Sequence, residues 1–130
     1  MIDGMLAIRS AQMEVLGDAV RLRFRNQVAA EIREHLPDHY AALGESGVHA
    51  AIEAGISQAR GYAIVTEAGV TIFVRFMMLF GLEFDEDPSL PWARLVLEDP
   101  GYADEASRIA ALRDAGMEYL RALESGQSHE

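Results

Sequence analysis

The chain has 130 residues, half of them hydrophobic, which suffices for one ordinary core but not for two independent domains. Its formal charge of -10, from 11 Lys and Arg against 21 Asp and Glu, repels nucleic acid phosphates and anionic lipid head groups, so neither is an expected partner. Cysteine is absent, which excludes disulfides and thiol catalysis. A basic surface on another protein suits this charge better.

The first long element is predicted over residues 11–36, where apolar side chains recur every three or four positions. The stripe consists of Met13, Leu16, Val20, Phe24, Val28, Ile32 and Leu36. Ser10 can cap the start of this helix, and Pro37 ends it because proline cannot continue the hydrogen-bond ladder. Residues 1–9 lack a basic leader and a long apolar stretch, so no secretory signal is expected and a cytoplasmic location is favoured.

Two further helices follow a short helical turn over residues 38–43. Gly44 suits a left-handed cap after that turn, and a helix over residues 47–60 ends near Gly61. Thr66 is the predicted N-cap of the next helix, over residues 67–82. Glu67 lies in the first turn of that helix, where the helix dipole favours negative charge.

The run from Val70 to Leu82 is apolar on every side of a helix except at Thr71 and Arg75. Other elements or a partner must cover such a helix, so it is predicted to form the buried centre of the fold. The run falls short of the roughly 20 residues that span a bilayer, so no membrane insertion is expected. Apolar surface left uncovered on this helix would favour a homodimer. Arg75 is predicted to pair with an acidic residue of another helix, with a partner contact as the alternative.

An acidic linker over residues 83–92 holds two of the four prolines and the only tryptophan. Pro91 fits the first turn of a short helix over residues 91–97, and the last helix is predicted over residues 103–123. Residues 125–130 form a polar tail that is expected to be disordered. The fold class is therefore all-α, a single-domain bundle over residues 1–124. Four principal helices and one or two short ones surround the central helix.

The first candidate metal ligands are Glu31, His35 and His39, whose spacing of four residues would place them on one helical face. Pro37 interrupts this face. A small metal-dependent hydrolase that uses His35, His39 and acidic residues is the alternative function. The acidic residues 83–87 lack the glycine and the distant glutamate of a calcium loop. No catalytic residue, metal site or cofactor is therefore predicted, and the chain is expected not to be an enzyme.

The acidic linker is the predicted docking segment for a protein partner, because its carboxylates can steer a basic surface. Trp92 either locks this segment onto the core under Leu90 and Leu95 or anchors the partner. The predicted partner-binding residues are Phe84, Asp85, Asp87, Leu90, Trp92 and Arg75.

Three stretches carry a resemblance to a known group of proteins. They are Ala59-x-x-Tyr62-x-Ile64-x-x-Glu67-x-x-Val70, then Gly81-x-x-Phe84-Asp85-x-Asp87-Pro88-x-Leu90-Pro91-Trp92-Ala93, and then Ile109-x-x-Leu112. The chain resembles small uncharacterised helical proteins of Gram-negative bacteria that are often encoded beside type VI secretion effectors and spike components. This resemblance implies an adaptor, chaperone or immunity-like role, with a secreted effector or a spike component as the partner.

Overall fold

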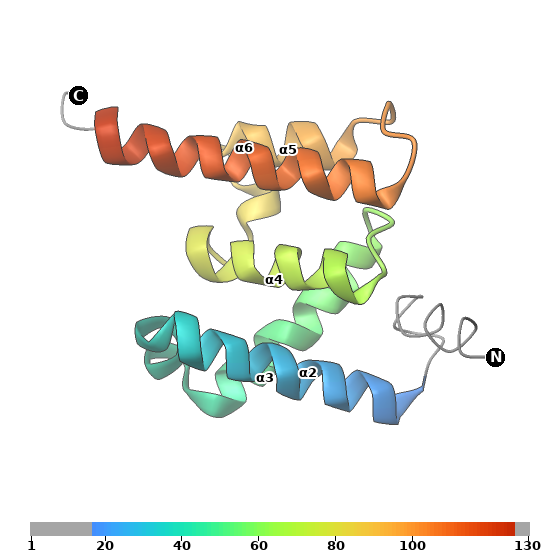
Figure 1. The fold of residues 1–130 in the computed structure, drawn as a ribbon, viewed down its shortest axis with the longest axis vertical. Helices are drawn as coiled ribbons and strands as arrows, with labels where there is room; N and C mark the ends of the chain where they lie inside the picture. Colours follow the sequence, from blue (N-terminus) through green and yellow to red (C-terminus); the bar gives the residue numbers. More distant parts are fainter. Residues whose placement is uncertain (1–16, 127–130) are drawn as a thin grey trace. The chain divides into compact units, whose positions relative to one another are not determined.

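The computed structural model describes residues 17–126, and all regular structure in this range is helical (Figure 1). The elements are α2 (Asp18–His35), α3 (Pro37–Arg60), α4 (Glu67–Phe80), the 3-10 helix η2 (Phe84–Glu86), α5 (Pro91–Glu98) and α6 (Glu105–Gly126). The predicted all-α class is confirmed. Contacts group the chain into two compact units, with the boundary between Leu82 and Glu83, and each unit is described by itself.

Helix α2 begins later than predicted. Gly17 has a φ of 89°, outside the helical region, so the helix starts at Asp18 and the expected helix over residues 11–36 does not run unbroken through Gly17. The proposed cap at Ser10 lies outside the described residues. At the other end, Leu36 has a φ of -132° and Pro37 starts the next helix, so the predicted stop is confirmed. The buried stripe of α2 consists of Phe24, Val28, Ala29 and Ile32.

Helix α3 is kinked at Gly44, where φ is 76° and ψ is 165°. This kink separates the predicted helical turn from the predicted helix over residues 47–60, so the break at Gly44 is confirmed. Farther along, Gly55 lets α3 approach α4 closely, because a Cβ atom on Gly55 would lie 2.7 Å from Val74 Cγ2 and 2.9 Å from Met77 Sδ. Glu53 of α3 also pairs with Arg21 of α2 at 2.9 Å.

Helix α4 is the buried element that the apolar run predicts. Thr66 caps its start, since Oγ1 accepts a hydrogen bond from the Gly69 amide at 3.1 Å. The helix ends at Phe80, two residues before the predicted end, because Gly81 adopts a φ of 120°. Its buried residues are Gly69, Val70, Phe73, Val74, Phe76, Met77 and Met78. Leu82, at 44% exposure, is the one large apolar side chain of residues 70–82 that is exposed.

The second unit contains η2, α5 and α6. Helices α5 and α6 lie side by side and run in opposite directions (Figure 1). Pro91 occupies the first turn of α5, as predicted. Asp104 caps α6, since Oδ1 accepts a hydrogen bond from the Ser107 amide at 2.9 Å. Helix α6 continues to Gly126, so the predicted tail loses its first two residues to the helix, and residues 127–130 lie outside the described range.

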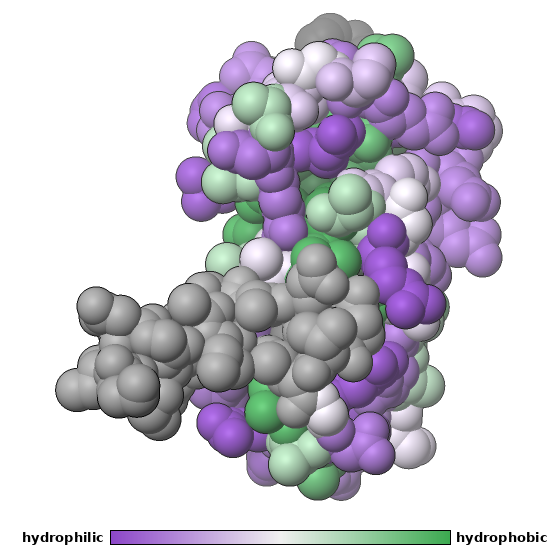
Figure 2. Space-filling model, turned by 90° about the vertical axis from the view of Figure 1, so that its right-hand side faces the viewer, coloured by the Kyte–Doolittle hydropathy of each residue, from purple (hydrophilic) through white to green (hydrophobic). Residues whose placement is uncertain are grey.

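Few large apolar side chains are exposed among the described residues. On the face in Figure 2, hydrophilic side chains predominate and apolar ones form small separate patches. The exposed large apolar residues are Leu22, Leu43, Leu82, Leu95, Met117 and Leu123. None of the helices in residues 17–126 has both the length and the hydrophobicity needed to cross a bilayer. Single exposed apolar side chains are ordinary, so a candidate site also needs a cavity or neighbouring polar groups.

Candidate functional site

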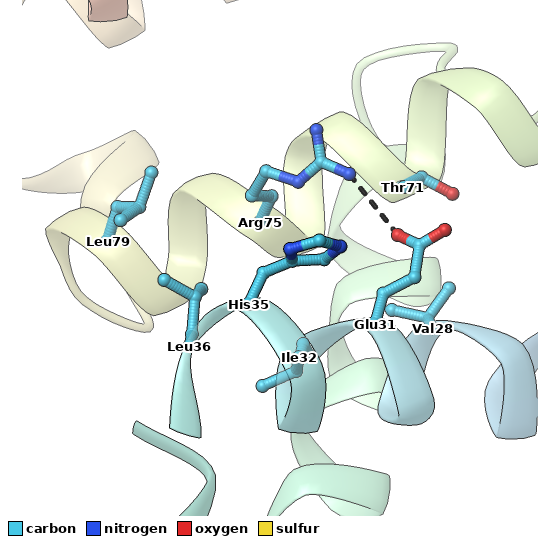
Figure 3. Close-up of a pocket in the computed structure, with 8 residues that line it drawn as sticks. All are labelled: Val28, Glu31, Ile32, His35, Leu36, Thr71, Arg75 and Leu79. Atoms are coloured by element: carbon cyan, nitrogen blue, oxygen red, sulfur yellow. Dashed lines mark hydrogen bonds and ion pairs between the residues drawn. The ribbon is translucent and has the colours of Figure 1, made fainter. Parts of the chain in front are cut away.

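The first candidate is a cavity of about 300 Å³ between α2 and α4, here called the α2–α4 cavity (Figure 3). Its lining residues are Val28, Glu31, Ile32, His35, Leu36, Thr71, Arg75 and Leu79. Of these, Val28 and Ile32 are buried, each at 4% exposure. Thr71 is polar, but its hydroxyl donates to the Glu67 carbonyl oxygen at 2.7 Å and is thus used within α4. The interior is therefore apolar.

Charged side chains form the rim of the α2–α4 cavity. Arg75 donates a hydrogen bond to Glu31 Oε1 at 3.2 Å, and the two side chains are 46% and 50% exposed (Figure 3). The predicted pairing of Arg75 with an acidic residue of another helix is confirmed, but the pair is half exposed. Pairs this exposed contribute about 0–1 kcal/mol to stability.

His35 also lies at the rim, on the last turn of α2 (Figure 3). The predicted metal set needs His39 on the same helical face, but the chain leaves α2 at Leu36 and His39 belongs to α3. Nowhere within residues 17–126 do three or more His, Asp or Glu side chains gather closely enough to hold a metal ion. The ligands of the hydrolase alternative are thus not assembled in the described part of the chain.

The predicted docking residues divide between the units: Arg75 belongs to the first, and the other five belong to the second. Phe84, Asp85 and Leu90 are 1%, 5% and 5% exposed. They are buried within the fold and offer a partner no surface. Asp85 is the one charged residue that is buried among those the structure describes.

Asp87 and Trp92 have local structural roles. Asp87 Oδ1 accepts hydrogen bonds from the Ser89 hydroxyl at 2.7 Å and from the Ser89 amide at 2.9 Å. The hydroxyl bond, and then the amide bond, lower the pKa of Asp87 from its ordinary value of 3.8. Trp92 is half-buried, and its ring centroid lies 5.6 Å from that of Tyr119 on α6. This contact matches the locking role expected for Trp92.

The second candidate is an open groove of about 780 Å³ beside α5, here called the α5 groove. Its lining residues are Glu86, Asp87, Pro88, Pro91, Arg94, Leu95, Glu98, Asp99 and Pro100. Leu95 is 71% exposed, the highest exposure of any large apolar side chain that the structure describes. The lining therefore combines exposed proline and leucine side chains with carboxylates.

Leu95 was missed as a site residue because it was assigned to the core. Its 71% exposure makes it a surface residue of α5. The helical period shows why: Pro91, Leu95 and Glu98 are four and three positions apart and share one face. Ala93 and Leu97 share another face and are 0% and 2% exposed. A helical-wheel reading of α5 would have placed Leu95 on the outside.

The second unit holds most of the negative charge. Residues 83–130 contain 4 Arg and 12 Asp and Glu, so their net charge is 4 - 12 = -8 of the -10 in the whole chain. Arg94 is the one basic residue that lines the α5 groove, and it pairs with Glu98 at 3.2 Å. Asp99 Oδ1 accepts a hydrogen bond from the Gly101 amide at 2.8 Å, which fixes the loop at one end of the groove. The lining of the α5 groove is thus partly apolar and carries a net negative charge.

No protein-family model matches the chain, and no curated protein or solved structure matches it either. The function is therefore argued from these two sites.

Proposed function

We propose that this protein is a non-enzymatic accessory protein, and that it binds a basic segment of another protein in the α5 groove. The observation that carries the proposal is the 71% exposure of Leu95 among carboxylates. An exposed apolar side chain is costly to keep in water and gains about 25 cal/mol for each Å² that a partner covers. Leu95, with Pro88 and Pro91 beside it, would serve as the apolar contact at the centre of the interface.

The negative charge of the α5 groove favours a basic partner. The α5 groove is lined by Glu86, Asp87, Glu98 and Asp99, and Arg94 is already paired with Glu98. A Lys or Arg side chain that approaches Leu95 gains attraction from these carboxylates, whereas an acidic segment is repelled. Complementary charge of this kind raises association rates and suppresses wrong partners. The expected ligand is a segment with basic residues on both sides of one large apolar residue.

The groove is already ordered without a partner. The Ser89 bonds to Asp87 hold one side, and the Gly101 bond to Asp99 holds the other. Arg108 of α6 donates to the Leu97 carbonyl oxygen at 2.7 Å and fixes the last turn of α5. Because these parts are held beforehand, less conformational entropy is lost on binding. A preformed groove fits a protein that captures a flexible segment of its partner.

The setting follows from the resemblance to helical proteins encoded beside type VI secretion effectors. A secreted effector or a spike component is the proposed partner, and an adaptor, chaperone or immunity-like role is the proposed task. In an adaptor or chaperone role, the groove would bind a basic segment of that partner until the partner is released. In an immunity-like role, the same contact would block the partner.

The test is affinity capture from the native host with a tagged chain, followed by a binding measurement with the purified partner. Leu95→Asp removes the apolar contact and would bury a carboxylate against the large apolar residue of the partner, which costs more than its attraction to flanking basic residues gains. The matched control is Leu22→Asp on α2, because Leu22 is also exposed, at 48%, but lies in the other unit. We expect wild type and Leu22→Asp to bind one basic protein with equal affinity, and Leu95→Asp to bind it at least tenfold more weakly.

Two results contradict this proposal. A partner that binds wild type and Leu95→Asp equally would place the interface elsewhere. Capture of no partner by the wild-type chain under any tested growth condition would remove the protein-binding function itself.

A further inference from the structure

We propose that the α2–α4 cavity binds a small amphiphile with a carboxylate head and a short alkyl chain, the chain inside the cavity and the head on Arg75. This site lies within the first unit and is independent of the α5 groove. Its parts are an apolar interior, a size suited to a small ligand, and a cationic group at the rim.

The interior selects an alkyl chain. Val28 and Ile32 from α2 are buried, and Leu36 and Leu79 are half-buried. Thr71 uses its hydroxyl proton within α4, so it has no donor left for a carboxylate head. The volume of about 300 Å³ lies at the lower end of the range for ligand sites in proteins. A short chain therefore fits better than a long fatty acid or a steroid.

Arg75 selects the head group. Its guanidinium has five N–H donors. One of its nitrogens donates a hydrogen bond to Glu31 at 3.2 Å, and the Arg75–Glu31 pair is half exposed (Figure 3). An exposed pair of this kind is weak, so a carboxylate from a ligand can compete for or share the guanidinium. Guanidinium and carboxylate form two parallel, charge-assisted hydrogen bonds. A cationic head would face Arg75 with like charge, and a neutral hydroxyl head would gain neither an ion pair nor the second parallel hydrogen bond.

A ligand carboxylate must compete with Glu31 for the Arg75 guanidinium, so substitutions at both residues test the proposal. If the Arg75–Glu31 pair only stabilised the fold, loss of either partner would weaken the site. If Arg75 holds a ligand carboxylate, Arg75→Gln weakens carboxylate binding and Glu31→Gln strengthens it. The two substitutions are thus expected to act in opposite directions.

The experiment is calorimetric titration of the full chain with octanoate, octanol and octylamine. We expect octanoate to bind most tightly, and Arg75→Gln to weaken octanoate about tenfold while octanol binds unchanged. Glu31→Gln is expected to tighten octanoate several-fold. Lengthening the ligand from hexanoate to heptanoate to octanoate is expected to tighten binding up to about fourfold for each added methylene, until the cavity is full.

Arg23→Gln is the matched control, since Arg23 lies on an exposed face of α2 and does not line this cavity. It is expected to leave all three affinities unchanged, and circular dichroism checks that each variant is folded. Equal binding of octanol and octanoate overturns the proposal, as does a preference for octylamine. Failure of all three ligands to bind, or weaker octanoate binding in both the Arg75→Gln and Glu31→Gln variants, also overturns it.

Discussion

Arg108 of α6 donates a hydrogen bond to the carbonyl oxygen of Leu97 at 2.7 Å, and this bond ties α6 to the last turn of α5. The same nitrogen also donates to the carbonyl oxygens of Asp99 at 2.9 Å and Val96 at 3.3 Å. The last carbonyls of a helix have no partner within the helix, and a cation near them is favourable. Arg108 therefore holds the end of α5 where the α5 groove closes at Asp99.

Replacement of Arg108 is expected to destabilise the protein. Arg108→Met keeps much of the side chain's bulk but removes the Arg108 donor from the Leu97 and Asp99 carbonyl oxygens, while Val96 keeps the Asp99 amide as a donor. This loss should lower the free energy of unfolding by about 1–3 kcal/mol. Urea denaturation measures this change. The control is Arg113→Met, an exposed position of the same helix, which is expected to change stability by less than about 0.5 kcal/mol. Equal losses in the two variants would show that Arg108 has no special role.

The contact of α3 with α4 is expected to tolerate no side chain at position 55. A Cβ atom there would lie 2.7 Å from Val74 Cγ2, so Gly55→Ala should lower the free energy of unfolding by about 1–3 kcal/mol, although alanine has the higher helix propensity. Gly55→Ala combined with Val74→Ala should cost less than the sum of the two single changes, because the clash is relieved. Strict additivity of the two costs would contradict the packing seen here.

Stability is expected to fall in acid through Asp87 and Asp104. The pKa of Asp104 is lowered from 3.8, first by the backbone bond from Ser107 and then by its side-chain bond, and Ser89 lowers the pKa of Asp87. A lowered folded-state pKa means that the ionised carboxylate contributes stability above 3.8, and this contribution disappears as the pH falls through the folded-state pKa.

The check is urea denaturation at steps between about pH 5 and about pH 2. Asp104→Asn keeps an N-cap side chain but removes the titrating group, so its stability should depend less on pH than that of wild type. Asp114→Asn removes the same charge from an exposed position of α6 and should follow the wild-type curve more closely. If the free energy of unfolding of Asp104→Asn fell more steeply in acid than that of wild type, the predicted contribution of Asp104 would be contradicted.

Divalent metal ions are expected to leave the melting temperature unchanged. A metal that binds only the folded chain adds about 2.7 kcal/mol of stability at one hundred times its Kd, so even a modest site would be visible. Differential scanning calorimetry with added Zn²⁺ or Mg²⁺ measures the shift, and His35→Ala/His39→Ala is the control. A rise in melting temperature that this double variant loses would instead support the metal-dependent hydrolase.

The helices were predictable because strong local signals mark them. The apolar period, the cap at Thr66 and the stop at Pro37 each act within a few residues, so they can be read without knowing the fold. Gly17 and Gly81 show the limit of this approach. Each adopts a positive φ that ends or delays a helix, and the periodic pattern continues across both residues without showing it.

The candidate sites were less predictable, because burial depends on contacts between distant residues. Phe84 and Leu90 have the composition expected of a docking surface, yet they are buried, and Asp85 is buried as well. The α2–α4 cavity joins Glu31 to Arg75 across 44 positions of the chain, a relationship that no local pattern contains. Leu95 is the exception, since the helical period alone could have placed it outside.

The most direct test of the central claim is site-specific photo-crosslinking from the α5 groove in living cells of the native host. A photoreactive phenylalanine derivative replaces Leu95, and in a matched strain it replaces Leu22. The account predicts a covalent adduct to one basic protein from position 95 and none from position 22. No adduct from position 95, whether or not position 22 gives one, would contradict the proposed interface at the α5 groove.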